Sequence, residues 1–393
     1  MNTIILDDII DIISGGTPKT SNPEFWGGNI PWLSVKDFNN DNRYVYKTEK
    51  SITELGLNHS AATLLQKDDI VLSARGTVGA ITMVPFPMTF NQSCYGLRAK
   101  EGFDQTYLYY CVKNAVEKLK HITHGSVFDT ITRDTFRSIE VVIHSYKEQK
   151  AIADILSNLD NKIELNNHIN QNLEEQAKTI YKAWFIDKIP FEGLTPCSWI
   201  ETTLGEVCSC ELGGTPSRSM PEYWDGNIPW INSGEINRFR ITNPSETITE
   251  IGLSKSSTKL LPAKTTVIAI TGATLGQVSL LEIDSCANQS VVGVVPNEQL
   301  PYEFIYPFIN ANIQELITHQ TGGAQQHINK QNVEGLTIVV PSPEVMGEYV
   351  SLVSGIYGKI ALNCFENERL ISIRDALLPK LMSGEIEVSS IDL

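Results

Sequence analysis

The chain has 393 residues, of which 41% are hydrophobic and 20% are charged. This composition is typical of a soluble globular protein with two or three domains, and it excludes disordered, collagen-like and small disulfide-rich proteins. No apolar run reaches the roughly 18 residues of a membrane helix, and the first residues carry acids where a secretion signal carries lysines. We therefore expect a cytoplasmic protein with reduced cysteines.

The formal net charge of −15 is unevenly distributed along the chain. Residues 1–146 carry 14 basic and 16 acidic side chains, whereas residues 193–343 carry 7 and 14. An overall acidic chain is unfavourable for nucleic acid, because phosphate binding depends on Lys and Arg. The first part of the chain can nevertheless present a basic face, or a partner subunit can supply positive charge.

The first predicted body, residues 1–146, is of mixed α/β (α+β) type. A short β-rich run at residues 69–74 is bounded by turn residues, and a helical pattern covers residues 107–119. Neither GxGxxG nor GxxxxGK[ST] opens this body, so a nucleotide site is not expected.

A long helix follows at residues 147–192. Its seam positions alternate by four and three residues, which is typical of a coiled coil. They are Ile152, Leu156, Leu159, Ile163, Asn166, Asn170, Leu173, Ala177, Ile180 and Trp184.

The second half of the chain repeats the first. GGTPKTSNPEFWGGNIPW at residues 15–32 returns as GGTPSRSMPEYWDGNIPW at residues 213–230, with 13 of 18 positions identical. ARGTVG at 74–79 returns as TGATLG at 271–276, and NQS at 91–93 returns at 288–290. The repeat predicts a second body at residues 193–343 and a second helix at residues 344–393.

The second helix repeats the seam at an offset of 197 residues, and both seams contain two asparagines near their midpoints. An antiparallel pairing of the helices would place these amides opposite one another, where a slip of register would leave buried amides unpaired. The alternative is that the asparagines face solvent. The proposed helix-pairing residues are Asn166, Asn170, Asn363 and Asn367. Pro379 is expected to kink or end the second helix near Leu378. The predicted architecture is a pseudo-twofold tandem repeat that places two similar bodies at a fixed distance.

These motifs, together with the helix EQKAIADILSNLDNKIELNNHINQNLEEQ at residues 148–176, resemble the specificity subunit of type I restriction-modification systems. The resemblance covers nearly the whole chain. It implies that each body is a target-recognition domain reading one half of a gapped, bipartite DNA sequence, and that the helices set the gap. It also implies two methylation subunits carrying S-adenosylmethionine, which modify an adenine in each half-site. Motor-nuclease subunits would join them, and ATP and magnesium would belong to these partners, so this chain itself would hold no cofactor.

The residues predict no catalytic centre. An adenine methyltransferase needs an Asn/Asp-Pro-Pro-aromatic loop, and the most similar sequence in the chain is Asn22-Pro23-Glu24-Phe25. The second copy has Met220 in place of Asn22, so the amide is lost. Lys67-Asp68-Asp69 is the one acidic patch that resembles the metal-binding site of a nuclease. Its counterpart at residues 263–265 carries no acidic residue. No His spacing or CxxC pair suggests a metal site.

Candidate DNA-binding residues are the Arg, Lys, Asn, Gln, Tyr and hydroxyl side chains of the predicted loops, together with one glycine turn. In the first body they are Lys19, Thr20, Ser21, Lys36, Arg43, Tyr44, Tyr46, Arg75, Thr77, Asn91, Gln92, Ser93, Gly125 and Ser126. In the second body they are Ser217, Arg218, Ser219, Asn232, Ser233, Arg238, Arg240, Thr271, Thr274, Asn288, Gln289, Ser290, Gln325 and Gln326.

Comparing the copies separates two roles. Side chains shared by both bodies are expected to build the scaffold or contact phosphates. For the NQS triplets, a scaffold role and a DNA contact are both open. Side chains that differ are better candidates for reading bases: Lys19 against Ser217, Arg75 against Thr271, and Phe128-Asp129 against Gln325-Gln326. The differences predict an asymmetric target.

Two function classes remain open from the sequence. The first is a non-catalytic DNA-recognition subunit with apolar docking residues on the helix, for which Ile155, Ile169 and Phe185 are candidates. The alternative for these three side chains is that they close onto the adjacent body. The second is a two-headed protein-binding scaffold without base discrimination. They differ in whether the bodies distinguish DNA sequences.

Overall fold

The computed structural model describes residues 2–40, 42–122, 130–318 and 328–388. The chain divides into two compact units, of which unit 1 comprises residues 1–164 and 369–393 and unit 2 comprises residues 165–368. Each unit therefore combines one body with segments of both long helices. This division passes through the helices, whereas the boundaries predicted after residues 146, 192 and 343 separate helix from body and remain predictions.

Unit 1 is built around a four-stranded antiparallel sheet with the strand order β2-β8-β5-β6. These strands are β2 (Ile10–Ser14), β5 (Ile70–Ser73), β6 (Ile81–Met83) and β8 (Cys94–Ala99). β5 is buried at every position, as expected for a strand covered on both faces.

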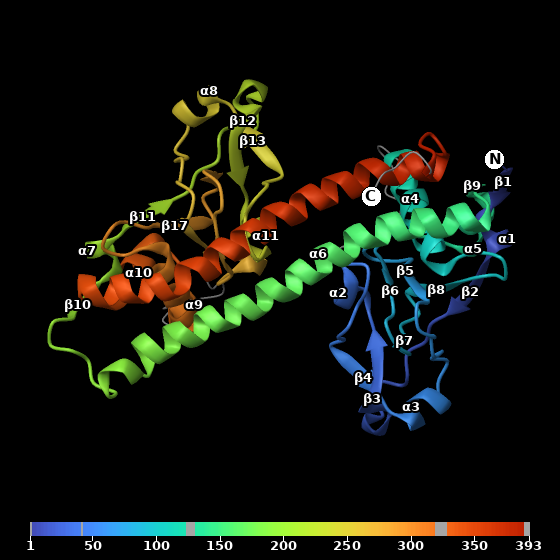
Figure 1. Ribbon diagram of the computed structural model, residues 1–393, viewed down its shortest axis with the longest axis horizontal. Helices are drawn as coiled ribbons and strands as arrows, with labels where there is room; N and C mark the ends of the chain where they lie inside the picture. The colour runs from blue at the N-terminus through green and yellow to red at the C-terminus, as the bar shows by residue number, and fades with distance from the viewer. Residues whose placement is uncertain (1, 41, 123–129, 319–327, 389–393) are drawn as a thin grey trace. The chain divides into compact units, whose positions relative to one another are not determined.

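A second sheet of unit 1 has the order β4-β3-β7, in which β3 pairs antiparallel with β4 and parallel with β7. Its strands are β3 (Trp26–Leu33), β4 (Lys50–Ile52) and β7 (Thr89–Phe90). β1 (Asn2–Ile5) pairs with β9 (Glu140–Ile143). The short helices are α1 (Leu6–Ile9), η1 (Pro23–Phe25), α2 (Val35–Phe38), α3 (Glu54–Asn58) and α5 (Arg133–Ser138). In Figure 1, α3 lies beside the hairpin of β3 and β4.

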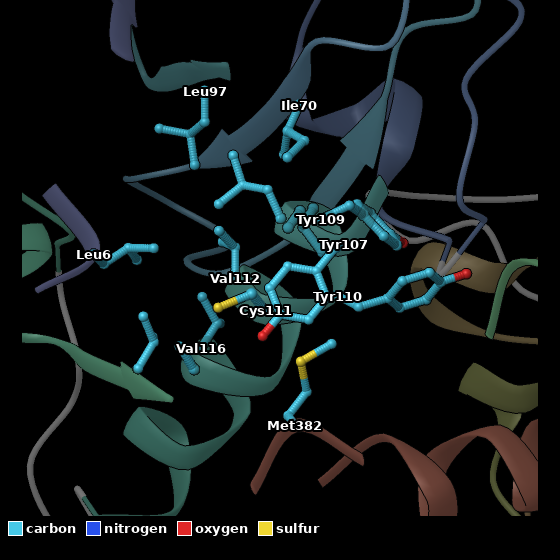
Figure 2. Packing of buried hydrophobic residues seen from close by; sticks show 14 of the residues in the cluster. Leu6, Ile70, Leu97, Tyr107, Tyr109, Tyr110, Cys111, Val112, Val116 and Met382 are labelled. Atoms are coloured by element: carbon cyan, nitrogen blue, oxygen red, sulfur yellow. The ribbon is translucent and has the colours of Figure 1, made fainter. Parts of the chain in front are cut away.

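Helix α4 (Gln105–Ile122) closes the core of unit 1. The Asp104 carboxylate caps its first turn by accepting from Tyr107 N (2.8 Å). The helix buries Tyr107, Leu108 and Val112 in a cluster that also contains Met382 from the end of α11, as Figure 2 shows. The last turn of α11 is therefore part of the core of unit 1.

Unit 2 repeats this architecture. Its four-stranded sheet has the order β11-β17-β14-β15, its second sheet has the order β13-β12-β16, and β10 pairs with β18. The strands are β10 (Ile200–Thr203), β11 (Ser209–Leu212), β12 (Trp224–Ile231), β13 (Glu246–Ile248), β14 (Thr266–Ala269), β15 (Val278–Leu280), β16 (Cys286–Ala287), β17 (Val291–Val295) and β18 (Thr337–Val340). The helices of this body are α7 (Leu204–Val207), η4 (Pro221–Tyr223), η5 (Ser233–Asn237), α8 (Glu250–Ser254), η6 (Gly272–Thr274), α9 (Tyr302–Thr318) and α10 (Lys330–Glu334). The mixed α/β tandem repeat predicted from the sequence is confirmed.

The two long helices are α6 (Tyr146–Tyr181) and α11 (Pro343–Ser383). Within unit 2 they run antiparallel, because Asn166 contacts Asn367 whereas Asn170 contacts Asn363. α6 continues into η2 (Lys182–Ile186), which is followed by η3 (Ile189–Phe191).

Of the two effects expected of Pro379, the helix end near Leu378 is wrong, whereas a kink there stays a prediction. α11 continues through Pro379 to Ser383. Leu381 and Met382, which follow the proline, are buried in the core cluster of unit 1. Packing of this last turn offsets the hydrogen bond that a proline cannot donate.

In the part of the chain that the structure describes, no helix is both long enough and apolar enough to cross a membrane.

Candidate nucleic-acid interface

Several of the predicted DNA-binding residues of unit 1 come together at one end of its four-stranded sheet. Because the strands are antiparallel, β2 and β5 end where β6 and β8 begin. The segments at this end are residues 15–18 after β2, residues 75–79 after β5 and residues 91–93 before β8. Ala74 N donates to Ser93 O (2.8 Å) and so joins the last two segments. We call this surface the loop end of unit 1.

Unit 2 has the same loop end. Residues 213–216 follow β11, residues 271–276 follow β14, and residues 288–290 precede β17. Ile270 N donates to Ser290 O (2.9 Å), which is the counterpart of the Ala74 contact. The two bodies therefore present equivalent sets of loops.

The NQS triplets hold these loops together. In unit 1, Asn91 Oδ1 accepts from Ser93 N (3.1 Å), and the Thr17 hydroxyl donates to Gln92 Oε1. The corresponding residues of unit 2 make the same contacts, Asn288 with Ser290 (3.0 Å) and Gln289 with Thr215. A turn closed by an Asn side chain is a structural feature, so these contacts favour the scaffold role for the asparagines. The amides of Gln92 and Gln289 remain exposed.

The shared tryptophans also belong to the scaffold. Trp32 is buried and its indole N–H donates to Gly16 O (3.0 Å). Trp230 donates to Gly214 O (3.1 Å) in the same way. These bonds attach the turn that follows β2 in unit 1, and the turn that follows β11 in unit 2, to the second sheet of the same body.

The charged side chains at the two loop ends differ. Lys19 and Arg75 of unit 1 are exposed, and within the described residues neither forms an ion pair. Lys36, on α2, is exposed as well. In unit 2, Arg218 pairs with Glu246 (Nη1 to Oε1, 2.5 Å), and its guanidinium lies 3.6 Å from the ring centroid of Trp224. Among the described residues, Lys19 and Arg75 therefore lack the ion pair that Arg218 makes, and of the two only Arg75 lies at the loop end as defined.

The remaining candidates at these loops are polar and at least partly exposed, namely Thr20, Ser21, Thr77, Ser217, Ser219, Ser233 and Thr274. Asn232 is held within the protein, because its side chain caps η5 by accepting from Gly234 N (2.8 Å). Gly125, Ser126, Phe128, Asp129, Gln325 and Gln326 lie outside the described residues.

Arg43, Tyr44 and Tyr46 do not lie at the loop end. Met83 N donates to Arg43 O (2.7 Å), which places this segment at the last residue of β6, the opposite end of the sheet. Arg43 Nη2 donates to Asn161 of α6, and Tyr44 donates to Asp68 (2.8 Å). Burial and this carboxylate raise the pKa of Tyr44 to about 12. Tyr46 bonds to Glu164 of α6. This segment therefore fastens the body to α6, and its role in DNA binding stays a prediction.

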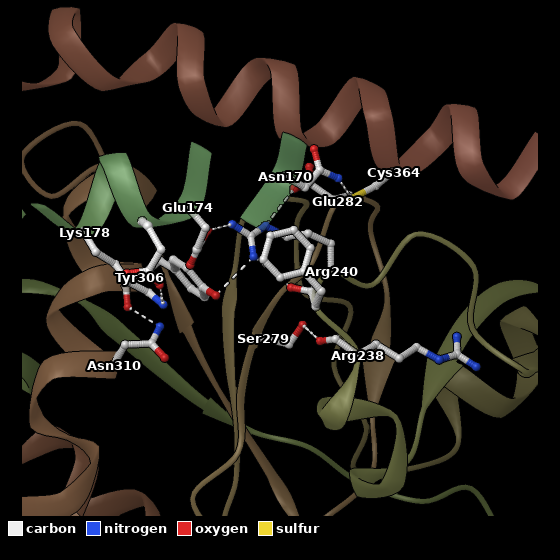
Figure 3. A network of polar contacts seen from close by, with 12 residues as sticks. Asn170, Glu174, Lys178, Arg238, Arg240, Ser279, Glu282, Tyr306, Asn310 and Cys364 are labelled. Carbon is white, nitrogen blue, oxygen red and sulfur yellow. Dashed lines mark hydrogen bonds and ion pairs between the residues drawn. The ribbon is translucent and has the colours of Figure 1, made fainter. Parts of the chain in front are cut away.

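Arg240 is the counterpart of Arg43 in the repeat and is likewise engaged within its own unit. Its side chain is buried (4% exposed), and it donates to Glu174 Oε2 of α6 (2.7 Å) and to the Tyr306 hydroxyl (3.1 Å), as Figure 3 shows. Glu282 lies 3.6 Å from its Nε. Burial alone would lower the pKa of Arg240, but Tyr306, Glu174 and Glu282 hold it above its ordinary value. A buried guanidinium with these partners is unavailable to DNA.

Arg238 lies beside this network and is engaged within unit 2. Its backbone carbonyl accepts from the Ser279 hydroxyl (2.8 Å), and its guanidinium donates to Asn243 O (2.7 Å) and lies 3.3 Å from Glu235. These contacts make Arg238 a weaker candidate for DNA than Lys19 or Arg75.

The four helix asparagines are brought together in unit 2. Asn166 Nδ2 donates to Asn367 Oδ1 (2.9 Å), and Asn363 Nδ2 donates to Asn170 Oδ1 (2.8 Å). All four side chains are buried. The alternative prediction, in which these asparagines face solvent, does not hold in the structure.

The two segments that could be mistaken for catalytic motifs have structural roles. Asn22 caps η1 by accepting from Glu24 N (3.1 Å). Asp69 is buried and binds the Arg98 guanidinium (2.6 Å), and Asp68 binds Tyr44. Among the described residues, no group of three or more His, Cys, Asp or Glu side chains is arranged to hold a metal ion.

The family follows from a comparison of the sequence with protein-family models. Residues 1–175 and 196–370 both match the type I restriction modification DNA specificity domain. The chain belongs to this family. The two matches correspond to the two copies of the internal repeat.

Relatives from the specificity family cover two thirds or more of the chain. The chain is 28% identical over 404 residues to the type I restriction enzyme MjaIX specificity subunit of Methanocaldococcus jannaschii, covering 98% of this chain and 93% of that protein. It is 28% identical over 336 residues to the HindI specificity subunit of Haemophilus influenzae, covering 67% and 72%. The solved structure of the type I restriction-modification S subunit from M. genitalium is 18% identical, covers 97% of this chain and 96% of that chain, and gives a TM-score of 0.57. The last comparison supports the fold.

Two of the three helix positions expected to dock partners of a specificity subunit pack inside the protein, whereas the docking role of Ile169, which is partly exposed, stays a prediction. Ile155 is buried in the core of unit 1, and Phe185 packs on Phe304 and Tyr349 in unit 2. Both side chains close onto the adjacent body. Leu165 (53% exposed) and Leu362 (66% exposed) are the more accessible apolar positions, and they are equivalent at the offset of 197.

Proposed function

We propose that the chain reads DNA through the two loop ends, one half of an asymmetric, gapped target by each body. The observation that carries this proposal is one loop architecture built twice with different exposed side chains. The phosphate backbone is chemically uniform, so the shared scaffold can contact it in both half-sites. The side chains that differ between the bodies can discriminate different bases. The long antiparallel helices would then set the gap between the half-sites.

The chain would contribute recognition and assembly rather than chemistry. The assembled complex would methylate adenine N6 and cut DNA through methylation and motor-nuclease subunits. S-adenosylmethionine, ATP and magnesium would be held by those subunits.

A genome-wide map of N6-methyladenine in the host, with and without this gene, tests the proposal. We expect a gapped, two-part motif that disappears on deletion and returns when the gene is restored. An unchanged methylation map, in cells that express the methylation subunits, would favour the two-headed protein-binding scaffold instead.

We further propose that Leu165 and Leu362 belong to two equivalent docking sites for the methylation subunits. They are exposed and occupy matching positions on copied helices, and this repetition in both copies is the observation that supports two equivalent docking sites. The expected result is that Leu165→Glu and Leu362→Glu each reduce co-purification of the methylation subunit, and that the double variant abolishes it. Leu260→Glu, at an exposed leucine (47%) outside the long helices, is the matched control. Unchanged co-purification of the double variant would contradict these sites.

A further inference from the structure

Arg75 and Thr271 occupy the same place in the two loop ends. In unit 1, the preceding residue, Ala74, donates to Ser93 O and accepts from Ile131 N (2.9 Å). In unit 2, the residue before Thr271 is Ile270. It donates to Ser290 O and accepts from Ile328 N (3.0 Å). The backbone on which each side chain stands is therefore anchored by the same pair of hydrogen bonds.

The turns that follow begin alike, although that of unit 2 is one residue longer and forms η6. The next residue is Gly76 (φ 80°) in unit 1 and Gly272 (φ 74°) in unit 2. Only glycine adopts this backbone conformation without strain. A Cβ added at either glycine would meet no atom within 4 Å, so both turns face open space. A ligand can approach the two positions from the same direction.

The Arg75 side chain is exposed on a fixed backbone. The Ser73 hydroxyl donates to Arg75 O (3.3 Å), and Arg75 forms an antiparallel bridge with Thr130. Within the described residues, no carboxylate pairs with its guanidinium. Its five N–H donors are therefore not taken up by a carboxylate of the described residues, and the anchored backbone needs no further ordering when they bind.

The difference between the copies indicates what Arg75 binds. DNA phosphates are the same under both bodies, so phosphate contact alone gives no reason for the side chain at this position to differ between the copies. Thr271 carries no charge on an equivalent backbone. A position that keeps its geometry but changes its side chain fits the recognition of different bases.

Resting on the proposed function, we propose that Arg75 and Thr271 are equivalent base-reading positions, one in each half-site. A guanidinium most often binds the O6 and N7 acceptors of guanine in the major groove, so Arg75 specifies one guanine in the half-site of unit 1. Thr271 reads the corresponding position of the other half-site through its hydroxyl or methyl group.

The test uses the full chain expressed with its partner subunits in the host, and maps N6-methyladenine. Arg75→Thr should relax one position of one half-site, so that methylation at sites with other bases there rises roughly tenfold or more relative to the guanine sites. The other half-site should remain unchanged. Thr271→Arg should alter a single position of that second half-site and leave the first unchanged.

Arg75→Lys separates base reading from charge. It keeps the positive charge and can still donate to O6 and N7 but loses the planar fork, so we expect the same position to be relaxed, to a smaller extent than in Arg75→Thr. If both Arg75 variants methylate the wild-type motif, at full or uniformly lowered level, Arg75 contacts phosphate or nothing and the inference is overturned. An absent gapped motif in wild-type cells would instead reject the proposed function, so the two failures are distinguishable.

Discussion

The side-chain amide of Asn363 donates a 2.8 Å hydrogen bond to Asn170 Oδ1 on the antiparallel helix. The bond from Asn166 to Asn367 is its repeat-related counterpart, because adding 197 to Asn166 gives Asn363 and subtracting 197 from Asn367 gives Asn170. The two bonds therefore obey a local twofold relationship. A shift of register would separate both pairs at once.

Asn363→Leu should destabilise the helix pair. It leaves Asn170 Oδ1 buried without this donor, which we expect to lower the free energy of unfolding by about 1–3 kcal/mol. The double variant Asn363→Leu/Asn170→Leu should recover part of the loss, because both polar partners are then replaced by apolar groups. Urea unfolding measures both. An unchanged midpoint for the single variant would show that the bond does not stabilise the pair.

Asp160 of α6 and Arg374 of α11 form a buried contact between the two long helices in unit 1. Arg374 Nη1 lies 2.9 Å from Asp160 Oδ1, and the Tyr110 hydroxyl donates to the other carboxylate oxygen (2.5 Å). The repeat-related positions are Tyr357 and Ala177, which are buried in an apolar cluster. The ion pair is therefore a feature of one copy and not a requirement of the fold.

Arg374→Met should be more harmful than removal of both charges. It leaves the Asp160 carboxylate buried without its cation, which costs about 3–5 kcal/mol. Asp160→Leu/Arg374→Met restores an apolar contact like that of the other copy and should be closer to the wild type. Thermal unfolding of both variants provides the comparison. A double variant less stable than Arg374→Met would contradict this reasoning.

His144 should make unit 1 less stable at mildly acidic pH. Burial lowers the pKa of His144, whose Nδ1 lies 2.9 Å from the Tyr107 hydroxyl, although Glu148 opposes the shift. Because the unfolded state binds a proton more readily, stability should fall as pH drops below about 6.5, the ordinary pKa of histidine. His144→Gln should flatten the pH dependence of the unfolding midpoint between about 6.5 and 5. An equal slope in wild type and variant would reject this role.

Native thiol reactivity should be confined to Cys197. It is exposed, whereas five of the other six cysteines are buried and Cys364 is partly so. Burial raises the pKa of Cys94, Cys111, Cys210 and Cys364 to about 12 and that of Cys208 and Cys286 to about 11. Since the thiolate is the reactive form, iodoacetamide at pH 7.5 to 8 should modify one thiol in the native chain and seven after unfolding. Rapid modification of a second thiol before unfolding would contradict the buried positions.

The repeat made much of this fold predictable from the sequence. The period of 197 residues, the strand runs such as residues 69–74 and the heptad seams identify elements that the structure contains. The end of α11 was not predictable from Pro379, because burial of Leu381 and Met382 is a tertiary effect that local propensity does not contain.

The loop ends were partly predictable. Turn residues such as Arg75 and Gln92 are recognisable by type and position, and antiparallel strands bring them together. Arg43 and Arg240 have the same residue type but lie against α6, since their partners Asn161 and Glu174 are distant in sequence. Glu174 was not identified from the sequence. The available signal is an acidic residue directly after the seam position Leu173, where it can reach the adjacent body.

The most direct test of the account replaces residues 1–146 with those of another specificity subunit and maps N6-methyladenine in the host. The account predicts that one half of the gapped motif changes while the other half and the gap are retained. A motif that stays the same in both halves, with methylation intact, would contradict the claim that each body reads its own half of the target.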